Sequence, residues 1–172
     1  MSVVPALARI PVGVVVERRR TTSPWIDFTW QPVMALPGRP DAAPWTVLSI
    51  DAGIATFYAG STEIALYRTE GGNYRDNLAC DVPLLWIALR PTGLEPPYEL
   101  LAVTADPAEG ESFTQTGKDL VATVSMPAAV RDIVEAFLAA HPVEQPFHKR
   151  KRDRADPEAL ARRRPRATDG HE

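Results

Sequence analysis

Short runs of β-branched and aromatic residues, separated by turns rich in proline and glycine, occupy most of this chain. Valine and isoleucine dominate residues 10–19, and these stiff side chains fit a pleated, partly buried strand. Large apolar residues alternate with other residues over 28–36, which is typical of a strand with one buried face. We predict strands at residues 10–19, 28–36, 45–50, 54–59, 63–68, 84–90, 98–104 and 120–125.

A helical period is clearest near the carboxyl end, from about residue 126 to residue 140. Apolar residues there are spaced by three and four, which predicts a helix with one buried stripe. The stripe consists of Val130, Ile133, Val134, Phe137 and Leu138. A shorter helix is predicted between Asp106, a capping residue followed by Pro107, and Gly117. Residues 74–81 fit a helical turn or a strand, and the apolar run at 84–90 predicts a central strand buried on both faces.

These elements predict an α+β fold, mainly an antiparallel curled sheet or open barrel of about seven strands, with the C-terminal helix packed on it. The chain has 17 prolines in 172 residues, about twice the average share of ~5%, which agrees with short elements and many turns. We expect a flexible lead at 1–9, a single β-rich domain at 10–147 and a disordered tail at 148–172.

Charge divides along the same boundary. Residues 1–147 contain 10 basic and 17 acidic side chains, a balance of -7, whereas residues 148–172 contain 9 and 5, a balance of +4. An acidic body argues against a nucleic-acid footprint across the fold. The basic run Lys149, Arg150, Lys151, Arg152 and Arg154 is a candidate for docking a partner, and nucleic acid is the less favoured one.

The chain has one cysteine, Cys80, so no internal disulfide forms. No segment approaches the ~20 apolar residues of a membrane-spanning helix. The N-terminus is a poor secretory signal, because its apolar runs are interrupted by Pro5, Arg9 and Pro11. We therefore expect a cytoplasmic protein without a membrane span.

The aromatic residues are the first candidates for binding. Trp25, Trp30, Trp45 and Trp86, with Phe28, Phe57 and Tyr58, could line a groove or simply pack at the core and its rim. Packing is the favoured interpretation, since tryptophan buries a large area. We expect Trp86 to lie in the core and Trp25 to be exposed, and we name Trp25 and Trp30 as candidate partner-binding residues.

Arginines 18–20 are the second candidate. Alternate residues of a strand point to opposite faces, so Arg18 and Arg20 share a side that Arg19 does not. They could bind an acidic partner, or they could be a solvated strand end that opposes edge pairing. We keep Arg18 and Arg20 as candidate partner-binding residues beside this structural alternative.

Candidate catalytic chemistry is sparse. A cysteine nucleophile needs a base such as histidine, and His141, His148 and His171 all lie at or beyond the end of the last predicted helix. Cys80 is therefore interpreted as structural. Neither a phosphate-binding loop nor a Gly-x-Ser-x-Gly elbow occurs. We predict no enzymatic activity, no catalytic residue, no metal site and no cofactor.

Several segments together resemble a small bacterial family, known as domain of unknown function 3305. They are residues 10–18, 24–25, 30–33, 90–99 and 143–154. The resemblance covers about residues 10–154, and it implies a genomic context: such proteins are often encoded near formate dehydrogenase and its maturation factors.

Residues and resemblance together lead to three functional hypotheses. The first is an accessory or assembly protein that binds a formate dehydrogenase subunit or maturation factor of a molybdenum-dependent enzyme. The second is a domain that binds a small molecule or the molybdenum cofactor. The third is a nucleic-acid-binding protein that uses the basic tail.

Overall fold

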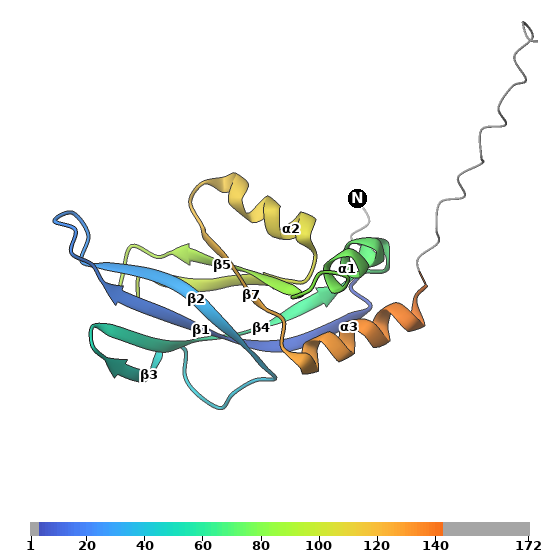
Figure 1. Ribbon diagram of the computed structural model, residues 1–172, viewed down its shortest axis with the longest axis horizontal. Helices are drawn as coiled ribbons and strands as arrows, with labels where there is room; N and C mark the ends of the chain where they lie inside the picture. Colours follow the sequence, from blue (N-terminus) through green and yellow to red (C-terminus); the bar gives the residue numbers. More distant parts are fainter. Residues whose placement is uncertain (1–3, 143–172) are drawn as a thin grey trace, which may run out of the picture.

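The computed structural model describes residues 4–142, and seven antiparallel strands form two packed sheets (Figure 1). Sheet A has the spatial order β2 (Phe28–Pro37), β1 (Ala8–Arg20), β4 (Ile54–Leu66) and β3 (Thr46–Asp51). Sheet B has the order β6 (Tyr98–Thr104), β5 (Leu84–Pro91) and β7 (Leu120–Ser125). The predicted α+β class with mainly antiparallel strands is confirmed, and within residues 4–142 the sheets are not closed into a barrel.

The core lies between the two sheets. In the middle of β1 on sheet A the inward side chains are fully buried, as are those of β5 on sheet B. These residues are Val12, Val14 and Val16 on β1, and Leu85, Ile87 and Leu89 on β5. Burying each such side chain stabilises the fold by roughly 1.5–3 kcal/mol. The β-branched and leucine runs that predicted these strands therefore also supply the contact between the layers.

Strand β4 differs from the sequence expectation, because residues 54–59 and 63–68 were predicted as separate strands. They form one strand, with a register shift opposite Val14 and Val15. Gly60 lies in this irregularity with a φ of 127°, a conformation that favours glycine. The glycine that indicated a turn instead makes a bulge inside a continuous strand.

Three α-helices complete the described chain (Figure 1). α1 (Gly71–Leu78) resolves the ambiguity at residues 74–81 in favour of a helix. α2 (Pro107–Ser112) begins at Asp106, whose side chain accepts from the Ala108 amide, and the following 3₁₀ turn η2 (Phe113–Thr116) ends at Gly117. A second 3₁₀ turn, η1 (Arg68–Glu70), precedes α1.

α3 (Ala128–Ala140) begins after Pro127, as the period predicts. Its buried stripe is narrower than expected: Val130, Val134 and Phe137 are buried, whereas Ile133 is 45% exposed. The reason is that α3 packs on α1 and β1 at one end of the sandwich, so only one line of side chains is covered.

Trp86 is a second difference. It was expected in the core, but it lies on the outer face of sheet B, half-buried beneath α2. Gly110 allows this contact, because a Cβ at that position would lie 2.1 Å from Cγ of Trp86. β5 is nevertheless the central strand of its sheet, as predicted.

Candidate partner-binding site

One end of the sandwich carries the β1–β2 hairpin and the β3–β4 turn, while α1 and α3 lie at the other end (Figure 1). We call this hairpin end the open end. Arg18 lies beside Trp30 of β2 and Ala55 of β4, and Arg20 lies beside Phe28. Because residues directly opposite in a sheet share a face, both arginines project to the inner face of sheet A.

The alternation predicted for the arginines agrees with their contacts. The Arg19 guanidinium hydrogen-bonds to the Glu17 carboxylate, its neighbour on the other face of β1. Arg18 and Arg20 instead contact aromatic rings. The structure therefore divides residues 18–20 into one ion-paired arginine and two that share an aromatic surface.

The Arg18 guanidinium lies over three rings. Its Cζ is 4.4 Å from the centroid of Phe28, 5.3 Å from that of Phe57 and 5.7 Å from that of Trp30. Arg20 lies 5.5 Å from the Phe28 centroid. Each cation–π contact contributes about 0.5–1 kcal/mol at an exposed site. We call Arg18, Arg20, Phe28, Trp30 and Phe57 the arginine–aromatic site.

Arg18 also has an unsatisfied donor. Its Nε is buried and has no hydrogen-bond partner, which costs about 1–3 kcal/mol. Five of the nine arginines of the described chain pair with carboxylates, whereas Arg18 and Arg20, like Arg68 and Arg75, do not. Positive charge is thus held against the rings without a compensating anion among residues 4–142.

The rings are themselves a continuous cluster. Trp30 lies 5.7 Å from Phe57 and 6.1 Å from both Trp45 and Tyr98, measured between centroids. Trp45 adopts a left-handed φ of 66°, and its amide donates to the Tyr58 carbonyl. Trp30 and Trp45 are half-buried and pack against the core, in agreement with the packing interpretation. Trp30 and Phe57 of this cluster are also the rings that the Arg18 guanidinium contacts.

Trp25 occupies a different position, in the loop at residues 21–27, which we call the hairpin tip. It is 91% exposed, and the next residue, Ile26, is also exposed. The loop is internally bonded: the Thr21 amide donates to the Asp27 carbonyl, and the Trp25 amide donates to Ser23 Oγ. An ordered loop therefore presents an indole ring to solvent, as the sequence predicted for Trp25.

Strand β3 adds an apolar edge that the sequence reasoning missed. All six of its residues are exposed, and Val47, Leu48 and Ile50 form the apolar part. Ile50 lies opposite Ala55, which lies opposite Arg18, so one row of the inner face runs from an exposed apolar residue to the arginine. The sequence did carry a signal for this edge, because residues 46–51 contain three apolar residues and no lysine, the residue that commonly protects an exposed edge strand.

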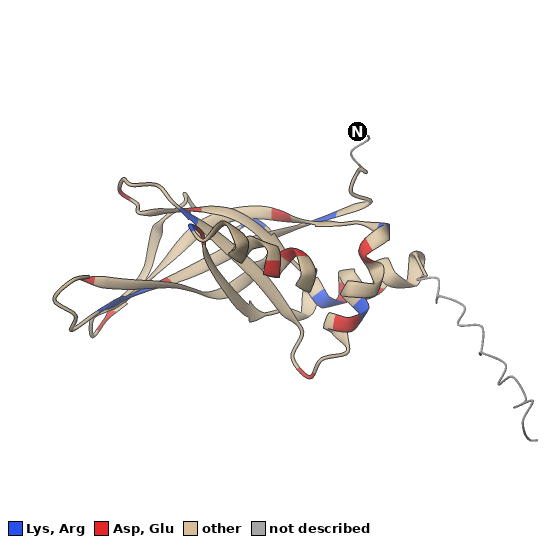
Figure 2. Cartoon of the chain, turned by 90° about the horizontal axis from the view of Figure 1, so that it is seen from above, with Lys and Arg blue, Asp and Glu red and all other residues tan. Residues whose placement is uncertain are grey.

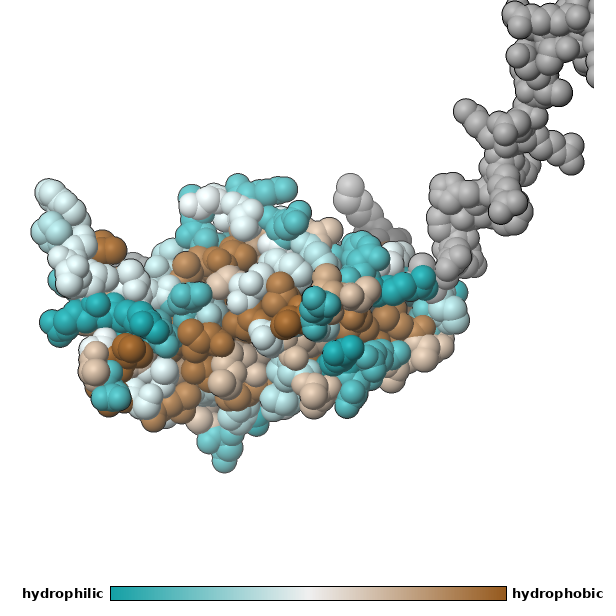
Figure 3. Space-filling model, in the orientation of Figure 1, coloured by the Kyte–Doolittle hydropathy of each residue, from teal (hydrophilic) through white to brown (hydrophobic). Residues whose placement is uncertain are grey.

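The surface of the open end is mixed in charge and hydropathy. Basic and acidic positions both occur on its strands and loops, and both also occur on the helices (Figure 2). Apolar and strongly hydrophilic surfaces lie side by side at the left end of the space-filling view (Figure 3). Such a mixture of aromatic, apolar and arginine surface is the composition enriched in protein interfaces.

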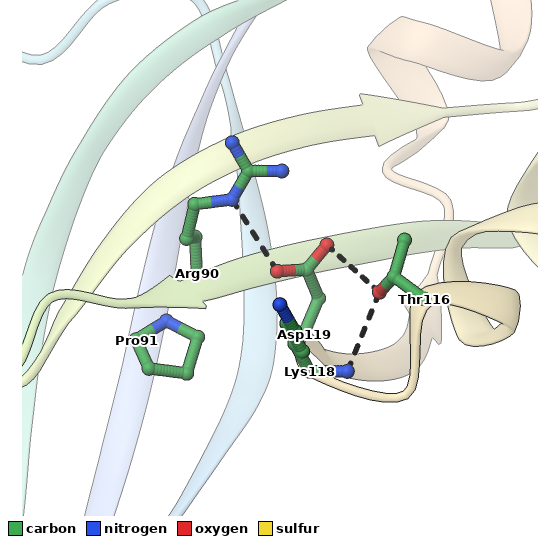
Figure 4. Close-up of a pocket in the computed structure, with 5 residues that line it drawn as sticks. All are labelled: Arg90, Pro91, Thr116, Lys118 and Asp119. Carbon is green, nitrogen blue, oxygen red and sulfur yellow. Dashed lines mark hydrogen bonds and ion pairs between the residues drawn. The ribbon is translucent and has the colours of Figure 1, made fainter.

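A separate hollow of about 740 Å³ is lined by Arg90, Pro91, Thr116, Lys118 and Asp119 (Figure 4). Arg90 Nε lies 3.5 Å from Asp119 Oδ1, and Thr116 Oγ1 lies 3.4 Å from Asp119 Oδ2. The Asp119 side chain is nearly buried, so it neutralises Arg90. Lys118 is the cation of this hollow that no carboxylate pairs within the described chain.

Buried polar groups near α1 and α2 are satisfied by one another. Asn77 Nδ2 donates to the carbonyls of Leu84 and Ala105, and its Oδ1 accepts from the Leu84 amide. The Tyr74 hydroxyl accepts from the Tyr67 amide, and burial raises the pKa of Tyr74 to about 12. This pKa already includes smaller raising effects of the nearby carboxylates of Asp106, Glu109 and Glu70, and a lowering effect of the hydrogen bond from Tyr67. These hydrogen bonds tie α1 to the neighbouring segments of the sandwich.

Cys80, interpreted from the sequence as structural, is exposed just after α1, and its thiol donates to the Asp76 carbonyl at 3.4 Å. No group of three His, Cys, Asp or Glu side chains with metal-binding geometry occurs among residues 4–142. In the same range no helix is long and apolar enough to cross a bilayer. The candidate residues Lys149, Arg150, Lys151, Arg152 and Arg154 lie outside the described residues.

Fold and surface define a small α+β sandwich protein with arginines stacked on aromatic rings at one end. A family model described as a protein of unknown function, DUF3305, matches residues 11–151. The chain belongs to this family, which confirms the resemblance derived from the sequence. No curated protein and no solved structure matches the chain.

Proposed function

We propose that this protein is a non-enzymatic accessory protein that acts by binding another protein through its open end. The observation that carries the proposal is the hairpin tip, which holds Trp25 91% exposed on the loop that follows β1, the strand that carries two arginines without ion pairs. Tryptophan and arginine are the residues most enriched among those that dominate binding energy at interfaces. Displaying both on one end of a rigid sandwich favours contact with a partner.

The partner we propose is a subunit or maturation factor of a molybdenum-dependent formate dehydrogenase. The support is the genomic context that the family resemblance implies. A docking role is compatible with the basic run at 149–154, which would add long-range attraction to an acidic partner.

A deletion strain assayed for formate dehydrogenase activity tests this function. Full-length protein should restore activity, whereas Trp25→Ala should restore less, because the exposed ring contributes to binding and hardly to folding. Ile133→Ala, an exposed apolar residue at the opposite end of the sandwich, is the matched control and should restore full activity. Undiminished dehydrogenase activity in the deletion strain itself would refute the role.

The hollow beside Arg90 and Lys118 favours a second candidate, binding of an anionic small molecule such as the molybdenum cofactor. Its volume of about 740 Å³ fits a compact ligand. Molybdopterin and guanine nucleotides should then raise the melting temperature of the wild type but not that of Lys118→Ala. Identical melting curves with and without these ligands would remove this candidate.

A nucleic-acid role through the basic tail ranks third. It predicts a gel shift that weakens steeply with added salt, and that is lost when residues 148–172 are deleted.

A further inference from the structure

We propose that the arginine–aromatic site is a carboxylate-binding site, which takes an Asp or Glu side chain from an extended segment of the partner protein. This inference rests on the proposed function and deepens it, because it names the chemistry that the partner presents. An apolar side chain of the same segment would contact the exposed side chain of Ile50.

Arg18 has the geometry of a preorganised anion receptor. Of its three guanidinium nitrogens, only Nε is buried without a partner, so the terminal nitrogens are the ones open to an incoming acceptor. Rings of Phe28, Phe57 and Trp30 hold the group in place. A planar guanidinium that is already fixed binds a carboxylate through two parallel hydrogen bonds with little loss of side-chain freedom.

Arg20 strengthens the case for an anion. It projects to the same face as Arg18 and shares the Phe28 ring with it. Residues i and i+2 of a strand are about 6.6 Å apart, so two positive charges are held near each other. With no carboxylate of residues 4–142 paired to either arginine, an external carboxylate would relieve their repulsion.

The apolar part of the site follows from the row Ile50, Ala55 and Arg18 across three strands. Ala55 is itself buried, at 2% exposed, so the surface open to a partner lies at the two ends of the row, where Ile50 is 72% exposed and Arg18 is half-buried. β3 and β1 are two strand spacings apart, about 10 Å. About three residues of extended chain span that distance, so one short segment can place an acidic side chain on Arg18 and an apolar one beside Ile50.

A protein carboxylate fits better than a nucleic-acid phosphate. The body of the chain carries a balance of -7 over residues 1–147, and this field opposes a polyanion that extends beyond the site. A single carboxylate within an otherwise apolar segment meets the two arginines without that repulsion. Aromatic and aliphatic surroundings also suit the side chains that flank an acidic residue in a peptide.

Selection of a displayed library of random dodecapeptides on the immobilised full-length protein tests this inference. Peptides that emerge are synthesised in pairs that differ by Glu→Gln or Asp→Asn, and binding is measured by fluorescence polarisation. The protein variants are Arg18→Met, which keeps an unbranched chain among the rings, and Arg18→Lys, which keeps the charge but not the planar fork. Arg19→Met, on the opposite face, is the matched control.

We expect the selected peptides to share an acidic residue. Amide substitution in the peptide, or Arg18→Met in the protein, should weaken binding at least about tenfold, as loss of one charge-assisted pair implies. Arg18→Lys should have an intermediate affinity, and Arg19→Met should stay within about twofold of the wild type. If Arg18→Met does not fold, the affinities of the peptide pairs for the wild type and for Arg18→Lys still test the carboxylate site.

The inference is overturned if no peptide is enriched, if enriched peptides lack a carboxylate, or if they bind Arg18→Met as well as the wild type. Displacement of the peptides by an oligothymidylate would overturn it in favour of phosphate binding. If peptide binding depends on Trp25 but not on Arg18, the proposed carboxylate site is refuted, whereas the proposed function of binding a partner protein is not. Failure of the contact function itself is seen separately, in the formate dehydrogenase assay.

Discussion

The side chains of this protein fall into two groups, those that stabilise the fold and those that the fold leaves exposed for binding. Tyr74 and Asn77 are buried and hydrogen-bonded, and they connect α1 to neighbouring strands. Trp25 and Arg18 are held by local structure, yet the Trp25 ring is exposed and the Arg18 guanidinium has no carboxylate partner within the described chain. This division is the basis for assigning one group to stability and the other to binding.

Tyr74 gives a prediction for alkaline pH. Its pKa is about 12 in the folded protein and 10.0 when unperturbed, chiefly because burial disfavours the phenolate. Since the folded-state value is raised, the stabilisation is complete below pH 10 and is lost as pH rises from 10 toward 12.

The measurement is the free energy of unfolding in urea between pH 9 and pH 12. The wild type should lose more stability over this interval than Tyr74→Phe, which cannot titrate. Equal losses in the two proteins would show that Tyr74 does not carry the effect.

Asn77 gives a second prediction at the scale of one side chain. It is 3% exposed and makes three hydrogen bonds, so Asn77→Ala leaves an amide and two carbonyls without these partners. We expect the free energy of unfolding to fall by about 3 kcal/mol, measured by urea denaturation. Arg75→Ala, on the exposed face of the same helix, should change it by less than about 0.5 kcal/mol. A cost below about 1 kcal/mol for Asn77→Ala would contradict this account.

At the scale of elements, each helix has one defined contact with the sandwich. α3 packs through a single line of apolar residues on α1 and β1, with Phe137 and Tyr74 6.1 Å apart between ring centroids. α2 lies on the outer face of sheet B, with Gly110 directly against Trp86. The contact between α2 and β5 therefore depends on the absence of a side chain at residue 110.

Two glycine substitutions test this contact. A Cβ at Gly110 would lie 2.1–2.6 Å from three atoms of Trp86, so Gly110→Ala must displace α2 or the ring. We expect a loss of about 1–3 kcal/mol or more in the free energy of unfolding. Gly72→Ala in α1, where a Cβ meets nothing within 4 Å, should stabilise by up to about 1 kcal/mol.

Opposite signs for the two variants, measured by thermal or urea unfolding, are the expected result. A Gly110→Ala protein as stable as the wild type would contradict the packing of α2 on Trp86.

Sequence patterns predicted β1, β2, β5, β6, β7 and α3 closely, because long β-branched or helical periods identify such elements. α1 was ambiguous, since its mainly polar sequence is also held by contacts far apart in the chain, of Asn77 with Ala105 and of Tyr74 with Phe137. The sequence also predicted the exposure of Trp25 and the placement of Arg18 and Arg19 on opposite faces of β1. It did not predict that Arg18 stacks on three rings or that β3 is exposed. Both features depend on which strands become neighbours in the fold.

At the scale of the whole molecule, a four-stranded sheet packs on a three-stranded one. β2 lies near β7 and β4 lies near β6, while β3 packs on β4 and stays exposed along its length. The helices α1 and α3 lie at the other end (Figure 1), and apolar and hydrophilic surfaces meet at the open end (Figure 3), where the side chains of the arginine–aromatic site are half-buried or exposed. Architecture, rather than any single residue, thus creates the candidate surface.

The central claim is that this protein works by contacting another protein through its open end. Site-specific photo-crosslinking in the native host tests it most directly, with a benzophenone side chain at position 25 and, as control, at position 133. Both positions are exposed and lie at opposite ends of the molecule. We predict one discrete adduct from position 25, containing a formate dehydrogenase subunit or maturation factor, and none from position 133. No adduct from position 25, or the same adducts from both positions, would contradict the claim.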